Sequence, residues 1–217
     1  TSPRALAYED QLRSTIGDSK LIVRVDRAEP NRNIVRGFRA YELLLTHHPE
    51  LLEEISFFAF LVPSRTHIRQ YQRYMDEINE ITNNINDRYG TDAWKPIQIF
   101  LDNNYSQAVA GLKLYDVLLV NTIIEGMNLV AKEGPIVNAR EGVLVLSESC
   151  GAYPQLKDHV LAVSPTDIQG TMDALFQGLN MATLERRQKS KDLYESISKA
   201  DINDWLCSQL DDIGNLL

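Results

Sequence analysis

The sequence predicts an α/β fold, a Rossmann-like open parallel sheet of about six strands with helices on both faces. Short apolar runs alternate with amphipathic stretches along nearly the whole chain of 217 residues, which is the pattern of βαβ units. The chain is 44% hydrophobic and has the size of one large domain, so it can bury a substantial core. It contains no internal repeat, low-complexity tract or flexible linker. We therefore expect a single domain over residues 1–217.

The first half of the chain shows helices and strands in alternation. Apolar residues at helical spacing share one face of each expected helix, and strands are continuous apolar runs. Pro49 ends the second helix because proline cannot continue it, and Ser64 is a candidate cap for the third. The elements expected here are helix 4–16, strand 21–26, helix 32–47, strand 55–62, a long helix with apolar positions from 68 to 85, and strand 97–101.

The second half continues the alternation and then changes character. Thr183 is a candidate cap for a helix whose first turn contains Glu185, an acidic residue that favours a helix start. The last short helix has an apolar stripe formed by Trp205, Leu206, Leu210 and Ile213. The elements expected here are strands 116–120, 143–147 and 159–163, helices 167–179 and 183–197, and a tail helix from about 201.

Charge and cysteine content exclude several classes of function. The net charge of −8 and the pI near 5.0 disfavour nonspecific binding to nucleic acid or anionic lipid, so we expect a small-molecule partner. Cys150 and Cys207 lack the spacing of metal ligands or redox pairs, and we expect two unpaired thiols in the core. The sequence shows neither a signal peptide nor an apolar run long enough for a membrane helix, which makes the cytoplasm the expected location and a membrane partner unexpected.

Residues 125–133 carry the clearest functional signal. They follow the expected strand 116–120, so the turn around Gly126 would open at the carboxyl edge of a parallel sheet, where such sheets hold ligands. A helix that starts there leaves backbone N–H groups free to bind an anion. Glu133 lies about one helical turn further on and can accept a hydrogen bond from a hydroxyl group. A sugar nucleotide has both an anionic part and hydroxyl groups.

Two arginines follow the first expected strand. Arg27 and Arg32 flank its loop, where both guanidinium groups can converge on a diphosphate. On the residue types alone, a pair of solvent-exposed arginines is the simpler interpretation.

Several motifs together resemble one known family. The stretch Val25–Asn33, the triplet Pro63–Arg65 and GMNLVAKE over residues 126–133 occur in this order. With residues 143–148, the Gly151-Ala152 pair, the turn 164–167 and the tail start 201–205, they resemble the trehalose-6-phosphate synthase family of glycosyltransferases. The likeness covers nearly the whole chain, but members of that family are much longer, and the chain resembles their carboxyl-terminal half. The resemblance implies a GT-B arrangement, in which two Rossmann-like domains face each other across a cleft.

The resemblance also implies roles for individual residues. Arg27 and Arg32 would be the catalytic groups, which neutralise the leaving diphosphate. Arg65 would face the acceptor, and Leu101 and Asn104 would lie near the nucleotide base. No metal and no cofactor is implied. The implied donor contacts are Arg27, Arg32, Glu125, Gly126, Met127, Asn128, Leu129, Val130 and Glu133.

The sequence departs from the family pattern at three places. Arg32 stands where lysine is usual, and Glu125 where the family has aspartate. Gly134-Pro135 interrupts the helix after the motif, so we expect that helix to be short or bent.

The resemblance implies that the complete enzyme transfers glucose, with retention, from UDP-, GDP- or ADP-glucose to glucose 6-phosphate, and that this segment alone is inactive. Two alternatives stay open: a transferase that uses glycerol phosphate or a cyclitol phosphate as acceptor, and a noncatalytic module that binds sugar nucleotides. The tail, residues 200–214, would cross back to the missing acceptor domain. Without that domain, we expect the tail to fold onto its own domain or to associate with a neighbouring chain.

Overall fold

The computed structural model describes residues 3–199 and 202–216, and contains a six-stranded sheet in the order β3-β2-β1-β4-β5-β6. Every neighbouring pair of strands is parallel. This is the strand order of a Rossmann sheet, so the predicted fold class is confirmed. The strands are β1 (Lys20–Arg27), β2 (Ile55–Val62), β3 (Ile97–Leu101), β4 (Val117–Val120), β5 (Val143–Ser147) and β6 (Leu161–Val163).

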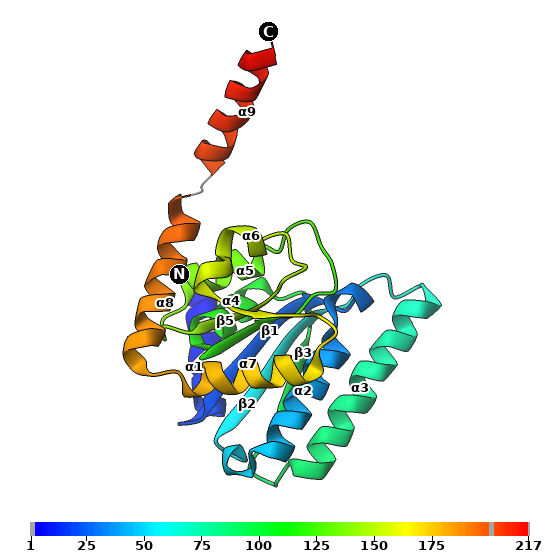
Figure 1. Ribbon diagram of the computed structural model, residues 1–217. Helices are drawn as coiled ribbons and strands as arrows, with labels where there is room; N and C mark the ends of the chain where they lie inside the picture. Colours follow the sequence, from blue (N-terminus) through cyan, green and yellow to red (C-terminus); the bar gives the residue numbers. More distant parts are fainter. Residues whose placement is uncertain (1–2, 200–201, 217) are drawn as a thin grey trace.

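Helices cover both faces of the sheet (Figure 1). Side chains of successive residues in β1 point to opposite faces: Ile22 packs in the core under α2, α3 and α7, whereas Leu21 and Val23 pack in the core under α1, α4, α5 and α8. The helices are α1 (Pro3–Ile16), α2 (Ile34–His47), α3 (Arg69–Tyr89), α4 (Tyr105–Leu114), α5 (Val130–Val137), α6 (Tyr153–Leu156), α7 (Ile168–Asn180), α8 (Thr183–Lys199) and α9 (Ile202–Leu216), with short 3₁₀ turns η1 (Pro30–Arg32), η2 (Pro49–Leu51) and η3 (Lys157–His159).

The sheet positions a site between β1 and β4. These two strands are neighbours, yet β1 continues into α2 on one face of the sheet and β4 continues into α5 on the other. The two connections therefore diverge, and they leave a crevice at the carboxyl ends of the strands.

The expected elements match the structure closely, with three differences in detail. Helix α2 begins two residues later than predicted, at Ile34, because residues 30–32 form the turn η1. The predicted cap of the third long helix is wrong: α3 begins at Arg69 after an extended Ile68, and the Ser64 hydroxyl instead donates to Glu29 Oε1 at 2.7 Å. The last strand begins two residues later than predicted, at Leu161, because residues 157–159 form the turn η3.

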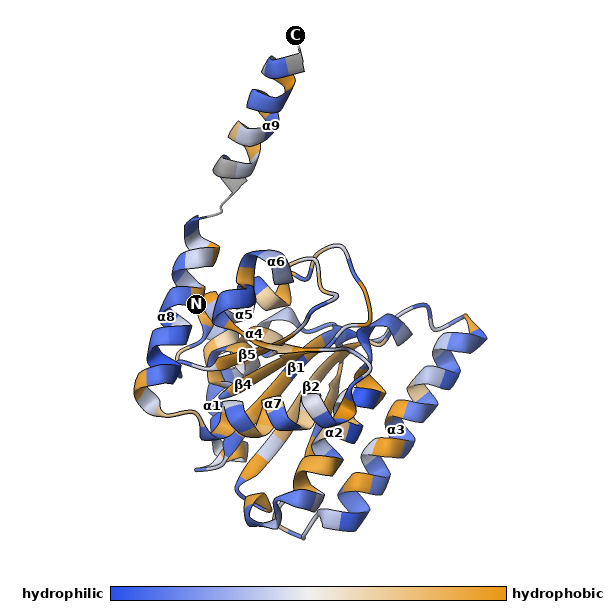
Figure 2. Cartoon of the chain, in the orientation of Figure 1, coloured by the Kyte–Doolittle hydropathy of each residue, from blue (hydrophilic) through white to orange (hydrophobic). Residues whose placement is uncertain are grey.

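The tail forms the predicted helix but does not pack on the sheet. Helix α9 extends beyond α8, away from the sheet, and Figure 2 shows apolar residues along it. The expectation that the tail folds onto its own domain is therefore wrong for this structure, and association with a neighbouring chain stays a prediction. The exposed fractions of its apolar stripe are 59% for Trp205, 49% for Leu206, 59% for Leu210 and 56% for Ile213.

The two cysteines have different environments. Both are free, and Cys150 is buried in the core as predicted. Cys207 is exposed on α9, so its predicted place in the core is wrong. The reason is that α9 lacks a packing surface on the sheet. In the described part of the chain, every helix is too short or too polar to cross a membrane.

These environments predict a difference in thiol reactivity. Burial raises the pKa of the Cys150 thiol and also blocks access to it, whereas Cys207 is open to solvent. In the native protein, a thiol reagent such as DTNB should modify Cys207 alone, and denaturant should release the second thiol. Rapid loss of both thiols in the native protein, or a Cys207→Ser variant that still reacts, would contradict the structure.

Candidate functional site

The corner between β4 and α5, residues 121–129, is fixed by contacts on the side that faces the protein interior. Asn128 is buried and its Oδ1 accepts from the backbone N–H of Ala131 at 2.9 Å, so this side chain caps α5. The backbone N–H of Gly151 donates to the Glu125 carbonyl at 3.0 Å. At Gly151, a Cβ would lie 1.7 Å from the Gly126 oxygen, whereas at Gly126 a Cβ would meet nothing within 4 Å. The outer side of the corner is therefore open. Helix α5 ends at Val137 and contains Pro135, so the predicted short helix is confirmed.

The turn after β1 is joined to the end of β4. Asn33 has a left-handed backbone with a φ of 59°, and its side-chain amide donates to the Asn121 carbonyl at 2.9 Å and to the Pro165 carbonyl at 2.6 Å. Asn121 donates back to the Asn33 carbonyl at 3.3 Å. This pair of amides holds turn η1, which carries Arg32, against the next strand of the sheet.

The two connections form one pocket of about 310 Å³. The structure thus brings Arg27 and Arg32 together with Met127 to Val130, although these segments lie about 100 residues apart in the sequence. Their role as ligand contacts stays a prediction. The residues that line the pocket are Val25, Asp26, Arg27, Arg32, Val62, Met127, Asn128, Leu129 and Val130.

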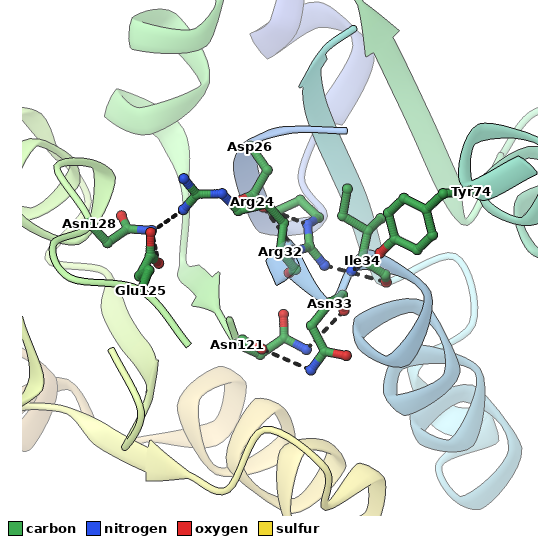
Figure 3. A network of polar contacts seen from close by, with 9 residues as sticks. All are labelled: Arg24, Asp26, Arg32, Asn33, Ile34, Tyr74, Asn121, Glu125 and Asn128. Atoms are coloured by element: carbon green, nitrogen blue, oxygen red, sulfur yellow. Dashed lines mark hydrogen bonds and ion pairs between the residues drawn. The ribbon is translucent and has the colours of Figure 1, made fainter. Parts of the chain in front are cut away.

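Both arginines already have carboxylate partners. Arg32 forms an ion pair with Glu125, and the two side chains are only 14% and 6% exposed (Figure 3). The other oxygen of Glu125 accepts from Asn128 Nδ2 at 2.8 Å. Arg27 is 55% exposed, and its guanidinium lies 3.2 Å from Glu29 Oε1. A bound anion would therefore share each guanidinium with a carboxylate, or displace that carboxylate.

A buried acid lies under the pocket. Asp26 is 8% exposed and accepts from the Nε and Nη2 of Arg24, at 3.0 and 2.8 Å. Burial raises the pKa of Asp26, and the Arg24 charge opposes that rise. Arg24 was not among the predicted site residues, although a charged residue in the middle of an apolar strand is a signal that could have identified it.

The remaining predicted residues lie outside this pocket. Glu133 lines a separate groove of about 250 Å³ along α4 and α5, which also includes Tyr105. Asn104 caps α4 by accepting from Gln107 N at 3.2 Å, and Leu101 is 49% exposed at the end of β3. Leu101 and Asn104 follow the carboxyl end of β3 and so lie on the same edge of the sheet as the pocket.

Arg65 does not line the pocket. It has a left-handed backbone with a φ of 45°, and its Nη1 donates to the Tyr71 hydroxyl at 2.8 Å. Its guanidinium also stacks on the Tyr71 ring, 5.3 Å from the ring centroid. Its predicted acceptor role stays a prediction.

The pocket has the chemistry of an anion site. Within residues 3–199 and 202–216, no group of three or more His, Cys, Asp or Glu side chains is placed to hold a metal ion. The polar groups that line the pocket are the guanidinium groups of Arg27 and Arg32, the Asp26 carboxylate, the Asn128 side chain and the backbone at the start of α5. The expectation that binding needs neither a metal nor a cofactor stays a prediction.

Comparison with known proteins gives consistent results. Residues 3–215 match the sequence model of glycosyltransferase family 20. The chain is 31% identical to a bifunctional trehalose-6-phosphate synthase/phosphatase of Thermoproteus tenax, over 94% of this chain and 28% of the relative. It is 32% identical to an alpha,alpha-trehalose-phosphate synthase [UDP-forming] of Pichia angusta, over 90% of this chain and 42% of the relative.

Solved structures agree with this result. An alpha,alpha-trehalose-phosphate synthase (UDP-forming) from Burkholderia xenovorans, in complex with glucose-6-phosphate, superposes with a TM-score of 0.90 at 31% identity and covers 96% of this chain. A structure described as trehalose-6-phosphate from E. coli bound with UDP-2-fluoro glucose has a TM-score of 0.89 at 30% identity and covers 98% of this chain. The chain spans 47% of each of these structures, and so less than half the length of the proteins it matches.

Replacement by alanine should have a large effect on stability at Gly151 and almost none at Gly126. Gly151→Ala should lower the free energy of unfolding by about 1–3 kcal/mol, because its Cβ would overlap the backbone of Gly126. Gly126→Ala should change that free energy by less than about 0.5 kcal/mol, because its Cβ points into open space. Denaturant unfolding of both variants measures the difference. Equal effects would show that Gly151 does not support the corner.

Proposed function

Because the chain belongs to glycosyltransferase family 20, we propose that it is the donor-binding half of a retaining glycosyltransferase, which transfers glucose from a nucleotide-glucose to a sugar phosphate such as glucose 6-phosphate. The main support for this proposal is that Arg27, Arg32 and the start of α5 line the same pocket. Its matched structures include one with a glucose phosphate and one with a fluorinated UDP-glucose. The fluorinated UDP-glucose is compatible with the chemistry of this pocket.

The pocket suggests how a donor would lie. The diphosphate would lie between Arg27 and Arg32, where two guanidinium groups can bind its oxygens. The hexose would lie over the corner at Gly126, where open space and backbone N–H groups are available. The ribose would extend toward Glu133, with the base on the Leu101 and Asn104 side of the second groove.

The arginines would act on the leaving group. During transfer, the bond between the anomeric carbon and the diphosphate breaks, and a bond from that carbon to the acceptor oxygen forms. Negative charge builds on the diphosphate as it leaves, and preorganised guanidinium groups stabilise that charge. The acceptor would attack from the face on which the nucleotide leaves, which retains the configuration, and the diphosphate would accept the proton of its hydroxyl. The acceptor itself would be held mainly by the part of the protein beyond this chain.

Two contacts in the structure bear on the identity of the acceptor. Arg65, the one residue that the family resemblance links to the acceptor, lies on Tyr71 in the described structure. Glu125, which would contact the sugar, is engaged by Arg32. These two observations favour keeping, as a second candidate, a transferase that acts on glycerol phosphate or a cyclitol phosphate. A noncatalytic module that binds sugar nucleotides would use the same pocket.

Calorimetric titration tests donor binding. UDP-, GDP- and ADP-glucose, and the free nucleoside diphosphates, are each titrated into the chain. We expect saturable binding of at least one nucleotide-glucose, and the preferred base identifies the donor. Absence of heat and of competition with all of them would contradict the proposal, whereas binding of nucleotide without transfer by a full-length protein would favour the noncatalytic module.

A matched pair of arginine variants tests the pocket. Arg27→Ala should weaken binding of the preferred nucleoside diphosphate by about tenfold or more, about 1.4 kcal/mol, because one of two phosphate-binding guanidinium groups is lost. Its melting temperature should hardly change, because the side chain is 55% exposed. Arg39→Ala is the control, since Arg39 is also exposed but lines another pocket. An unaltered dissociation constant in Arg27→Ala would remove this residue from the site.

Removing the charge of Glu125 should raise the affinity for free nucleoside diphosphate. Glu125→Gln removes the negative charge that neutralises Arg32 but keeps an oxygen that can accept from Asn128. Free nucleoside diphosphate should therefore bind about threefold to tenfold more tightly at low ionic strength, because the site loses a carboxylate that repels and competes with the ligand. The advantage of nucleotide-glucose over nucleoside diphosphate should shrink, because the carboxylate would accept from the hexose. Weaker binding of both ligands would contradict this charge balance.

A further inference from the structure

A buried arginine lies directly under the donor pocket. Arg24 is 0% exposed in the middle of β1, on the face of the sheet where its strand neighbour Ile22 and its β2 partner Ala59 belong to the hydrophobic core. Its guanidinium is paired with Asp26 and lies 5.9 Å from the centroid of the Phe38 ring. A buried ion pair of this kind is a weak source of stability, because desolvation offsets most of the attraction between the charges. The presence of this pair therefore calls for another explanation.

The other contacts of Arg24 go to the turn that carries Arg32. Arg24 Nη2 donates to the Arg32 carbonyl at 2.9 Å, and Nη1 approaches the Ile34 carbonyl at 3.4 Å. Figure 3 shows Arg24 between Asp26 and this turn, with the Arg32 side chain extending in the other direction, to Glu125. One guanidinium therefore holds the backbone on both sides of Asn33, while Arg32 presents its own charge to the pocket.

The surroundings are shaped to accept this guanidinium. A Cβ at Gly37 would lie 2.5 Å from Arg24 Nη1, so the absence of a side chain on α2 leaves the room that Arg24 occupies. The backbone N–H of Ile34 donates to the Tyr74 hydroxyl at 2.8 Å, which fixes the same turn from α3. Arg24 itself does not line the pocket.

We propose that Arg24 is a positioning residue: its buried guanidinium, neutralised by Asp26, holds turn η1 so that Arg32 projects into the pocket and binds the diphosphate. This inference rests on the proposed function only in that Arg32 binds an anionic ligand. It adds a residue that touches no substrate, and it gives the buried ion pair a role in binding rather than in stability.

A double-mutant cycle tests the proposal, with uridine, guanosine and adenosine diphosphate and inorganic pyrophosphate as probes. Arg24→Met with Asp26→Asn removes the pair without changing the net charge, and Gly37→Ala displaces the guanidinium without removing a charge. Each change should weaken probe binding by about fivefold or more when Arg32 is present, and by less than about twofold in an Arg32→Ala background. Equal weakening in both backgrounds would show a general structural effect and would overturn the proposal.

A second ion pair gives the matched control. Asp116 lies just before β4, at the opposite end of that strand from the pocket, and its Oδ2 is 3.2 Å from Arg140 Nη2. Asp116→Asn with Arg140→Gln should lower the melting temperature without changing probe binding, whereas Gly37→Ala should weaken probe binding even at temperatures well below its melting temperature. If wild type binds none of these probes, the proposed function fails. If wild type binds and the Arg24 variants bind equally well, only the positioning role fails.

Discussion

The parallel pairing of β1 with β4 is the constraint on which the rest of the structure depends. It places two strands side by side whose connections leave to opposite faces of the sheet, so their carboxyl ends cannot be covered by the helices that follow them. The reciprocal amide contacts of Asn33 and Asn121 then fix the spacing between the two connections. Guanidinium groups come from one side of this crevice and a helix start from the other. Neither half of the pocket would have an anion-binding geometry without its neighbour.

Charge balance is the second feature of the site. The chain has a net charge of −8, and both pocket arginines are paired with carboxylates, Arg32 with Glu125 and Arg27 with Glu29. Such pairs keep the site neutral in the absence of ligand, so a bound diphosphate gains only the difference between two sets of ionic contacts. The released carboxylate at Glu125 would be available for a hydroxyl group on the same ligand. In the proposed function, a site built in this way would favour an anion that also carries a sugar over a simple anion.

Local sequence predicted the elements well where one physical signal dominated. The strands 55–62, 97–101 and 143–147 have the predicted bounds. A short run that is apolar throughout is typical of a strand whose sheet is covered by helices on both faces. The pairing of Arg27 and Arg32 with the corner at Gly126 was also anticipated. Contacts between distant segments were not: the Ser64 hydroxyl reaches Glu29 instead of capping α3, and the buried Arg24 depends on Gly37 in another element. Helix periodicity likewise predicts an apolar stripe on α9, but it does not say what packs against that stripe.

Mapping of a bound nucleotide by NMR tests the central claim most directly. The backbone amide signals of the chain are followed in ¹H–¹⁵N spectra while its preferred nucleotide-glucose is added. The account predicts that the largest shifts occur at the α5 start, residues 126–130, and in the segment 27–33 after β1, because these two segments form the pocket. Shifts confined to the pocket between α2 and α3, which contains Arg36, Arg39 and Arg73, would place the ligand elsewhere and contradict it.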